Sequence, residues 1–231
     1  MKKLLAVAYI AFFASTAQAD FVDTDWKNEG DAKVTLDTET GIEWLKLENT
    51  ADLSYSELQS EMAAGGQFDG WRMPTVTEIR ELIYSVTVHS QLLANINTEN
   101  YRVNIGYNSD WAKNWRQIMG LSYYKPRDRS LAFGVSLDDD GSFILFGNAR
   151  VHTNNTQSFY INWTQPANYA DNERYSFFLV SDGGDTLSSI NDPTLNVNNP
   201  NSPARQVPIA FAPGLLGLFL VFRRRSKRPD A

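Results

Sequence analysis

The 231-residue sequence contains no cysteine and only two histidines. The absence of cysteine excludes disulfide bonds, thiolate nucleophiles and cysteine metal sites. His89 and His152 are far apart and have neither H-x-x-x-H nor H-E-x-x-H spacing, so a zinc hydrolase would have no ligand set. The G-x-S-x-G motif of many serine hydrolases is also missing. We therefore expect no metal site, no cofactor and no recognisable catalytic residue.

Basic residues are scarce between the two ends of the chain. Residues 20–206 contain 14 Lys and Arg against 26 Asp and Glu, a net charge of −12. Such a balance keeps a protein soluble and repels polyanions. Because nucleic-acid binding depends on neutralising phosphates with Lys and Arg, nucleic acid is not an expected partner.

Long apolar runs occur only at the two ends of the chain. At the start, Lys2 and Lys3 precede an apolar stretch from Leu4 to Ala14, and Ala17-Gln18-Ala19 has the small-x-small form of a cleavage site. This pattern is typical of a secretory signal peptide, here residues 1–19. We expect the rest of the chain to be exported.

The second apolar run, residues 207–222, is followed at once by Arg223, Arg224 and Arg225. From Ile209 the run is shorter than the ~20 residues that span a bilayer comfortably. The arginines would stay in the cytoplasm under the positive-inside rule, leaving the upstream domain outside. One interpretation of residues 207–231 is a plain transmembrane anchor.

The other interpretation of this tail is a sorting signal. Pro208, then Ala212-Pro213 and a Leu- and Gly-rich segment, then the three arginines, resemble the PEP-CTERM class of bacterial sorting tails, although Ala212 stands where that class has Glu. The resemblance implies cleavage by an exosortase-type membrane protease. Both interpretations place the domain at the cell envelope or outside it, held at least transiently by the C-terminal segment.

Two early helices are predicted from capping boxes. Ser54 with Glu57, and Thr75 with Glu78, have the spacing in which each side chain hydrogen bonds the other residue's backbone amide. Apolar residues then recur at helical spacing after both boxes. Pro74 keeps the chain extended before the second helix.

Strands are predicted mainly in the second half of the domain. Early candidates are residues 32–37 and 41–47; later ones are 131–137, 142–146, 175–181 and, more weakly, 158–163. Residues 138–141, Asp-Asp-Asp-Gly, suit a hairpin turn, with calcium binding by the carboxylates as the alternative. We expect an α+β fold with two early helices and a later antiparallel sheet, comprising residues 20–182. Residues 183–206 are expected to form a flexible stalk before the tail.

Three segments resemble the Lcl C-terminal-domain family, which is similar to C-type-lectin-like folds. They are D-T-E-T-G-I-E-W at 37–44, F-D-G-W-R-M-P-T at 68–75 with Glu78 and Leu82, and F-F-L-V-S at 177–181. The resemblance covers residues 34–181 and implies a lectin-like fold in an extracellular setting, but no catalytic residue. In the middle segment, Trp71 and Arg72 favour a structural role over ligand contact, with Arg72 either paired with Glu78 or lying over an aromatic ring.

Residues 111–129 form the one basic, aromatic segment of an acidic chain. The candidate ligand-binding residues there are Trp111, Trp115, Arg116, Tyr124 and Arg127. Flat aromatic faces beside hydrogen-bonding groups suit sugar rings, and the positive charges suit an acidic polysaccharide. In the alternative, the tryptophans pack in the core while Arg and Lys form surface ion pairs.

Three functions remain open from the sequence. The favoured one is an exported, envelope-sorted, non-enzymatic domain that binds an extracellular glycan or matrix component. The second is a structural surface or matrix protein without a small ligand. The third is an exported hydrolase with paired carboxylates, for which Glu43, Glu48 and Asp69 are available although their spacing marks no pair.

Overall fold

The computed structural model describes residues 21–87, 90–98, 100–106, 108–138, 140–164, 175–182 and 185–192. These residues form helices and mainly antiparallel sheets, which confirms the α+β class. The predicted signal peptide, His89, and the predicted sorting tail with Pro208, Pro213 and its arginines lie outside the described residues. Within the described ranges, every helix is too short or too polar to cross a membrane.

A small antiparallel sheet contains the two early strands. Its order is β1-β2-β3-β10, with β1 at Phe21–Thr24, β2 at Val34–Asp37, β3 at Glu43–Leu45 and β10 at Val180–Ser181. The turn between β2 and β3 is closed by the amide of Gly41, which donates to the Asp37 carbonyl at 2.7 Å. Gly41 has φ of 72°, a left-handed conformation that glycine adopts without strain. A short 3-10 helix, η1 at Leu47–Asn49, follows β3.

Both predicted capping boxes are present. Helix α1 spans Tyr55–Met62 behind Ser54, and helix α2 spans Val76–Val86 behind Thr75. In each box the hydroxyl accepts from the amide three residues later, and the glutamate accepts from the capping residue's amide. These reciprocal bonds satisfy amides that a helix start otherwise leaves open. Local sequence therefore determined where both helices begin.

A larger antiparallel sheet forms the second layer. Its strand order is β4-β8-β7-β6-β5, with a parallel addition of β9 to β6. The strand bounds are β4 Tyr101–Ile105, β5 Tyr123–Lys125, β6 Arg129–Leu137, β7 Phe143–Val151, β8 Thr156–Thr164 and β9 Ser176–Phe177. Leu137 pairs with Phe143, and the amide of Gly141 donates to the Asp138 carbonyl at 2.9 Å. The predicted hairpin turn is thus confirmed, and its second strand continues five residues beyond Phe146.

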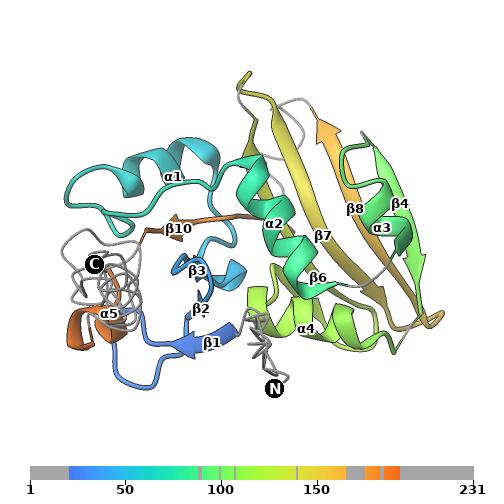
Figure 1. The fold of residues 1–231 in the computed structure, drawn as a ribbon, viewed down its shortest axis with the longest axis horizontal. Helices are drawn as coiled ribbons and strands as arrows, with labels where there is room; N and C mark the ends of the chain where they lie inside the picture. Colours follow the sequence, from blue (N-terminus) through green and yellow to red (C-terminus); the bar gives the residue numbers. More distant parts are fainter. Residues whose placement is uncertain are drawn as a thin grey trace, which may run out of the picture.

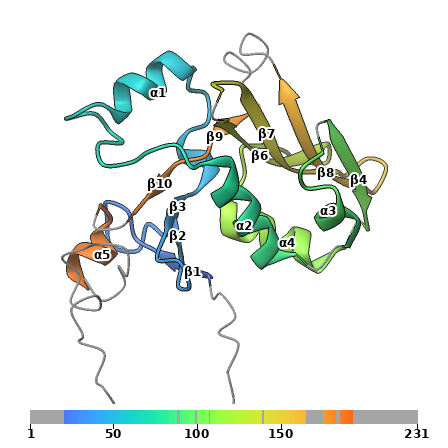
Figure 2. The ribbon, with the colours of Figure 1, turned by 45° about the horizontal axis from the view of Figure 1, so that its top comes forward.

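Helix α3 at Ser90–Ala94 and helix α4 at Asp110–Met119 were not predicted from the sequence. Helices α2, α3 and α4 lie together on one face of the large sheet (Figures 1 and 2). Between them and the sheet lies a core cluster that includes Ile83, Trp115, Ile144 and Phe159. The first part of the basic segment, which forms α4, therefore covers one side of this core.

The predicted strand at 175–181 is divided between the two sheets. Strand β9 joins the large sheet and β10 joins the small one, with Phe178 and Leu179 between them. The fully buried Phe178 ring meets Trp44 and Trp115 edge-on, at centroid distances of 6.5 and 6.3 Å. The segment from β9 to β10 therefore passes from the large sheet to the small sheet through the core that both sheets share.

The described domain extends beyond the boundary expected at residue 182. A short helix, α5 at Leu187–Asn191, lies in the segment expected to be stalk, beside the small sheet (Figure 1). The amides of Leu187 and Ser188 donate to the carbonyls of Trp26 and Asp25, at 2.7 and 3.2 Å. Part of the expected stalk is thus docked structure.

Candidate functional site

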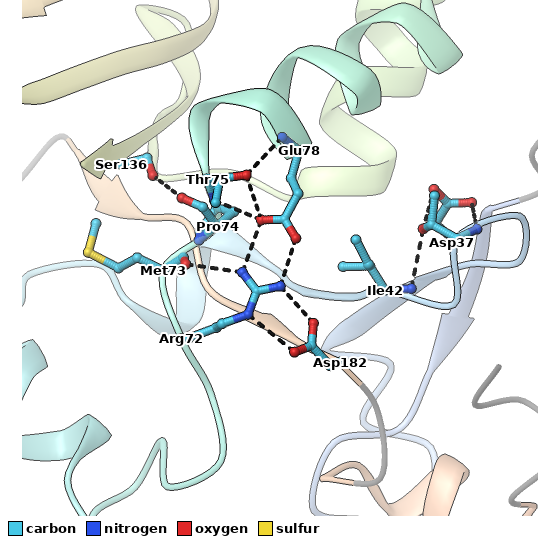
Figure 3. Close-up of polar contacts among 10 residues, drawn as sticks. Asp37, Ile42, Arg72, Met73, Pro74, Thr75, Glu78, Ser136 and Asp182 are labelled. Atoms are coloured by element: carbon cyan, nitrogen blue, oxygen red, sulfur yellow. Dashed lines mark hydrogen bonds and ion pairs between the residues drawn. The ribbon is translucent and has the colours of Figure 1, made fainter. Parts of the chain in front are cut away.

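Arg72 lies at the junction of the two layers and contacts two carboxylates (Figure 3). Its guanidinium donates to both oxygens of Glu78, at 2.9 and 2.7 Å, and to both oxygens of Asp182, at 3.4 and 2.6 Å. Its backbone exchanges two hydrogen bonds with Val180, at 2.9 and 2.8 Å. The predicted pairing of Arg72 with Glu78 is confirmed, and Asp182 is a second partner that the sequence did not reveal.

Charge and hydrogen bonding stabilise this ionised cluster. Burial opposes ionisation of Glu78, but hydrogen bonds from Arg72 and Thr75 and the positive charge of Arg72 outweigh it, so the pKa of Glu78 is lowered. Hydrogen bonds to Glu78, reinforced by Asp182, outweigh burial and raise the pKa of Arg72. Arg72 and Glu78 therefore both remain charged near neutral pH.

The same segment also binds the large sheet. The carbonyl of Pro74 accepts from the Ser136 hydroxyl of β6 at 2.6 Å. Trp71 is buried and meets Trp26 edge-on at 6.0 Å. Residues 71–75 thus connect β10, β6 and the start of α2, and these contacts favour the structural role expected for Trp71 and Arg72.

The two tryptophans among the candidate ligand-binding residues lie in the core. Trp115 is 0 % exposed and Trp111 is 8 % exposed. The Trp115 indole N–H donates to the Ala132 carbonyl at 3.1 Å, and its ring meets Phe159 edge-on at 5.3 Å. Both faces of the Trp115 ring are inside the protein, so it offers no stacking platform to a sugar. For these two residues the structure favours packing, the alternative weighed from the sequence.

The remaining candidates gather at one end of the large sheet. Tyr124 is 60 % exposed and stands in one register row with Ser130 of β6 and Arg150 of β7. Residues paired across antiparallel strands have their side chains on the same face of the sheet, so Tyr124 and Arg150 flank the small Ser130. Arg116 reaches this face from α4 and donates to the Asn148 amide oxygen at 2.6 Å.

The turn between β5 and β6 adds further cations to this end. Arg127 is exposed at the turn, with φ of 60°, and forms no ion pair with any described residue. Lys125 and Arg129 lie 3.5 and 3.4 Å from the single carboxylate there, that of Asp128. We call the group Arg116, Lys125, Arg127, Arg129 and Arg150 the basic end.

The basic end contains a residue that sequence reasoning missed. Arg150 is 21 positions after Arg129 in the sequence, and only the β6–β7 register brings it beside Ser130. The backbone of His152 is fixed to the same turn, since its amide donates to the Asp128 carbonyl at 2.7 Å. No local motif marks Arg150, so the sequence alone does not predict that it lies at the basic end.

The carboxylates considered for hydrolysis serve separate contacts. Glu43 accepts from the Thr186 hydroxyl at 2.6 Å, Glu48 from the Leu121 amide at 3.1 Å, and Asp69 from the Gly65 amide at 2.8 Å. Asp140 accepts from the Ser142 amide at 2.8 Å in the hairpin turn, which favours the turn interpretation of residues 138–141. Across the described ranges, no three His, Asp or Glu side chains are grouped so that they could hold a metal ion.

Comparisons with protein-family models, with curated proteins and with solved structures found no match to this chain.

Proposed function

We propose that this chain is an exported, non-enzymatic binding domain that holds an acidic extracellular polysaccharide or matrix component at its basic end. The observation that carries the proposal is the gathering of five cations and the exposed Tyr124 at one end of an otherwise acidic domain. An acidic polymer needs positive charge to neutralise it and flat or hydrogen-bonding groups to contact its sugar rings.

The charge is unevenly divided along the chain. Residues 21–87 contain 14 Asp and Glu against five Lys and Arg, whereas residues 101–164 contain five Asp against seven Lys and Arg. Three of those five Asp are residues 138–140, which follow the end of β6 that lies away from the β5–β6 turn. A long-range field of one sign at one end can steer an oppositely charged partner to that end. The acidic remainder repels the same polymer, which favours an oriented contact over general adhesion.

The binding residues proposed from the structure differ from those expected from the sequence. Arg116, Tyr124 and Arg127 remain, Arg150 is added, and Trp111 and Trp115 are assigned to the core. Because the neutral contact of Arg116 with Asn148 fixes the direction of its side chain, less conformational entropy is lost when an anion binds.

Binding of the full-length chain to a carboxylated and a sulfated polysaccharide, with neutral dextran as control, tests the proposal. We expect binding to both acidic polymers that weakens as salt is added, because screening shortens the reach of exposed charges. Arg127→Glu should abolish most of it. Lys27→Glu makes the same change of net charge in the small-sheet half and should bind like the wild type. An equal loss of polysaccharide binding in both variants would show that binding depends only on net charge, and would refute a localised site.

The cellular setting is part of the proposal. The signal peptide, the PEP-CTERM-like tail and the Lcl-like motifs together support a lectin-like surface domain that an exosortase-type protease sorts at the envelope. Mass spectrometry of the mature protein tests this, with loss of residues 1–19 and of the terminal arginines expected. A mature chain that retains Arg223–Ala231 would exclude cleavage in the tail.

The burial of Trp111 and Trp115 also keeps a second candidate function in view, a structural surface protein without a small ligand. This candidate predicts that neither acidic polymer binds at any salt concentration. The polysaccharide experiment therefore decides between the two.

A further inference from the structure

Glu43 is a buried carboxyl at the point where the small sheet meets α5. It lies in β3, pairs with Leu36 on one side and Ser181 on the other, and is 2 % exposed. Its Oε1 accepts from the Thr186 hydroxyl at 2.6 Å, whereas its Oε2 is buried without a hydrogen-bond partner. The basic end and the Arg72 cluster make no use of this group.

The contacts that hold α5 are mainly polar. Thr186 caps the helix, and its hydroxyl is shared between Glu43 and the Ser189 hydroxyl, which lies 2.7 Å away. Ser188 adds a side-chain contact, accepting from the Asp25 amide at 2.9 Å. Of the two large apolar side chains of α5, Ile190 is 62 % exposed and Leu187 is only partly buried. Apart from the partial burial of Leu187, the helix therefore depends on these hydrogen bonds around Glu43.

We propose that Glu43 is a pH-sensitive latch, whose neutral form holds α5 against the small sheet and whose ionised form releases it. Helix α5 is the last described element, so the latch would control how the chain leaves the domain toward residues 193–231. The inference does not depend on ligand binding at the basic end.

The charged groups around Glu43 support this assignment. Burial raises the pKa of Glu43, opposed by hydroxyls of Thr186, Ser189 and Ser181, and the nearby charge of Asp185 raises it further. The other carboxylates on the packed elements have their own donors: Asp37 accepts from Thr40, Asp25 from the Gly30 and Ala32 amides, and Asp182 from Arg72. Glu43 forms no ion pair with any described residue, so these hydroxyls are what stabilises its ionised form, and burial outweighs them.

The direction of the pH response follows from linkage. A carboxyl whose pKa is higher in the docked state than in the open state favours docking while it is protonated. As pH rises from the open-state pKa to the docked-state pKa, the opening constant of α5 increases by up to about tenfold per pH unit, then levels off.

Hydrogen exchange of the full-length chain between about pH 4 and pH 8 tests the latch, with rates divided by the intrinsic exchange rate at each pH. We expect protection of the 187–191 segment to fall as pH rises, while protection of α2 stays constant. Glu43→Gln, which cannot ionise, should keep α5 protected across the range. Thr186→Val, which removes the donor to Glu43, should leave α5 unprotected throughout.

Glu48→Gln is the matched control, since it neutralises another hydrogen-bonded glutamate and should retain the wild-type response. Circular dichroism and a thermal melt of each variant establish that it is folded. Wild-type protection that is independent of pH would overturn the proposal. An unchanged pH response in folded Glu43→Gln would overturn it equally, because the titrating group would then be another residue.

Discussion

Replacing Trp115 separates core packing from ligand contact, the two roles that its sequence context allowed. The residue is fully buried between α4 and the large sheet, with Phe159 and Phe178 edge-on to its ring and its N–H bonded to the Ala132 carbonyl. If these contacts are its whole role, substitution changes stability and leaves the affinity of the folded protein unchanged. Trp115→Ala and Trp115→Phe test this at two sizes of cavity.

The expected magnitudes follow from these contacts. Truncating a buried Trp to Ala costs about 3–5 kcal/mol, since the cavity closes only in part. A domain of this kind has about 5–15 kcal/mol of total stability, so Trp115→Ala is expected to be close to unfolding. Trp115→Phe keeps an aromatic ring but loses the hydrogen bond to Ala132, which costs about 1–3 kcal/mol when the acceptor stays buried.

The assay measures unfolding and binding on the same samples. Urea unfolding followed by circular dichroism gives the free energy of unfolding, and polysaccharide binding is measured well below the unfolding midpoint. Arg127→Ala is the counterpart, an exposed substitution expected to change stability by less than about 0.5 kcal/mol and to weaken binding. A folded Trp115→Phe protein of wild-type stability that has lost binding would refute the packing assignment.

Three further predictions concern stability. Arg72→Ala is expected to lower the free energy of unfolding by about 1–2 kcal/mol, a value limited by the solvent exposure of the cluster. Glu78→Gln should also lower the free energy of unfolding, and this decrease should become smaller in urea titrations below the ordinary glutamate pKa of about 4.3. A decrease that is unchanged at low pH would contradict the ion pair. Gly134→Ala places a methyl group against the Phe178 ring and should cost about 1–3 kcal/mol, whereas Gly106→Ala meets open space, so equal melting temperatures would contradict the close contact. Glu43→Gln should be more stable than the wild type at neutral pH and equal to it at acidic pH, because the raised pKa means that stability is lost as pH rises; a pH-independent difference in thermal melts would count against this.

The elements that the sequence predicted are those fixed by neighbouring residues. The capping boxes at Ser54 and Thr75 and the turn at residues 138–141 depend on contacts within five positions, and all three were located correctly. Helix α4 had a readable pattern too, since Trp111, Trp115, Ile118 and Met119 recur on one helical face. Its interleaved Lys and Arg residues, however, favoured the interpretation of this segment as a binding surface.

What the sequence determined by itself was chemical inventory and local geometry: no cysteine chemistry, an acidic domain, two helix starts and the arginine that pairs with Glu78. Only the tertiary structure decided which aromatic side chains are buried, that Arg150 joins Arg116 and Tyr124, and that α5 closes over Glu43. Burial and strand register depend on contacts between residues far apart in the chain, and no short pattern encodes them.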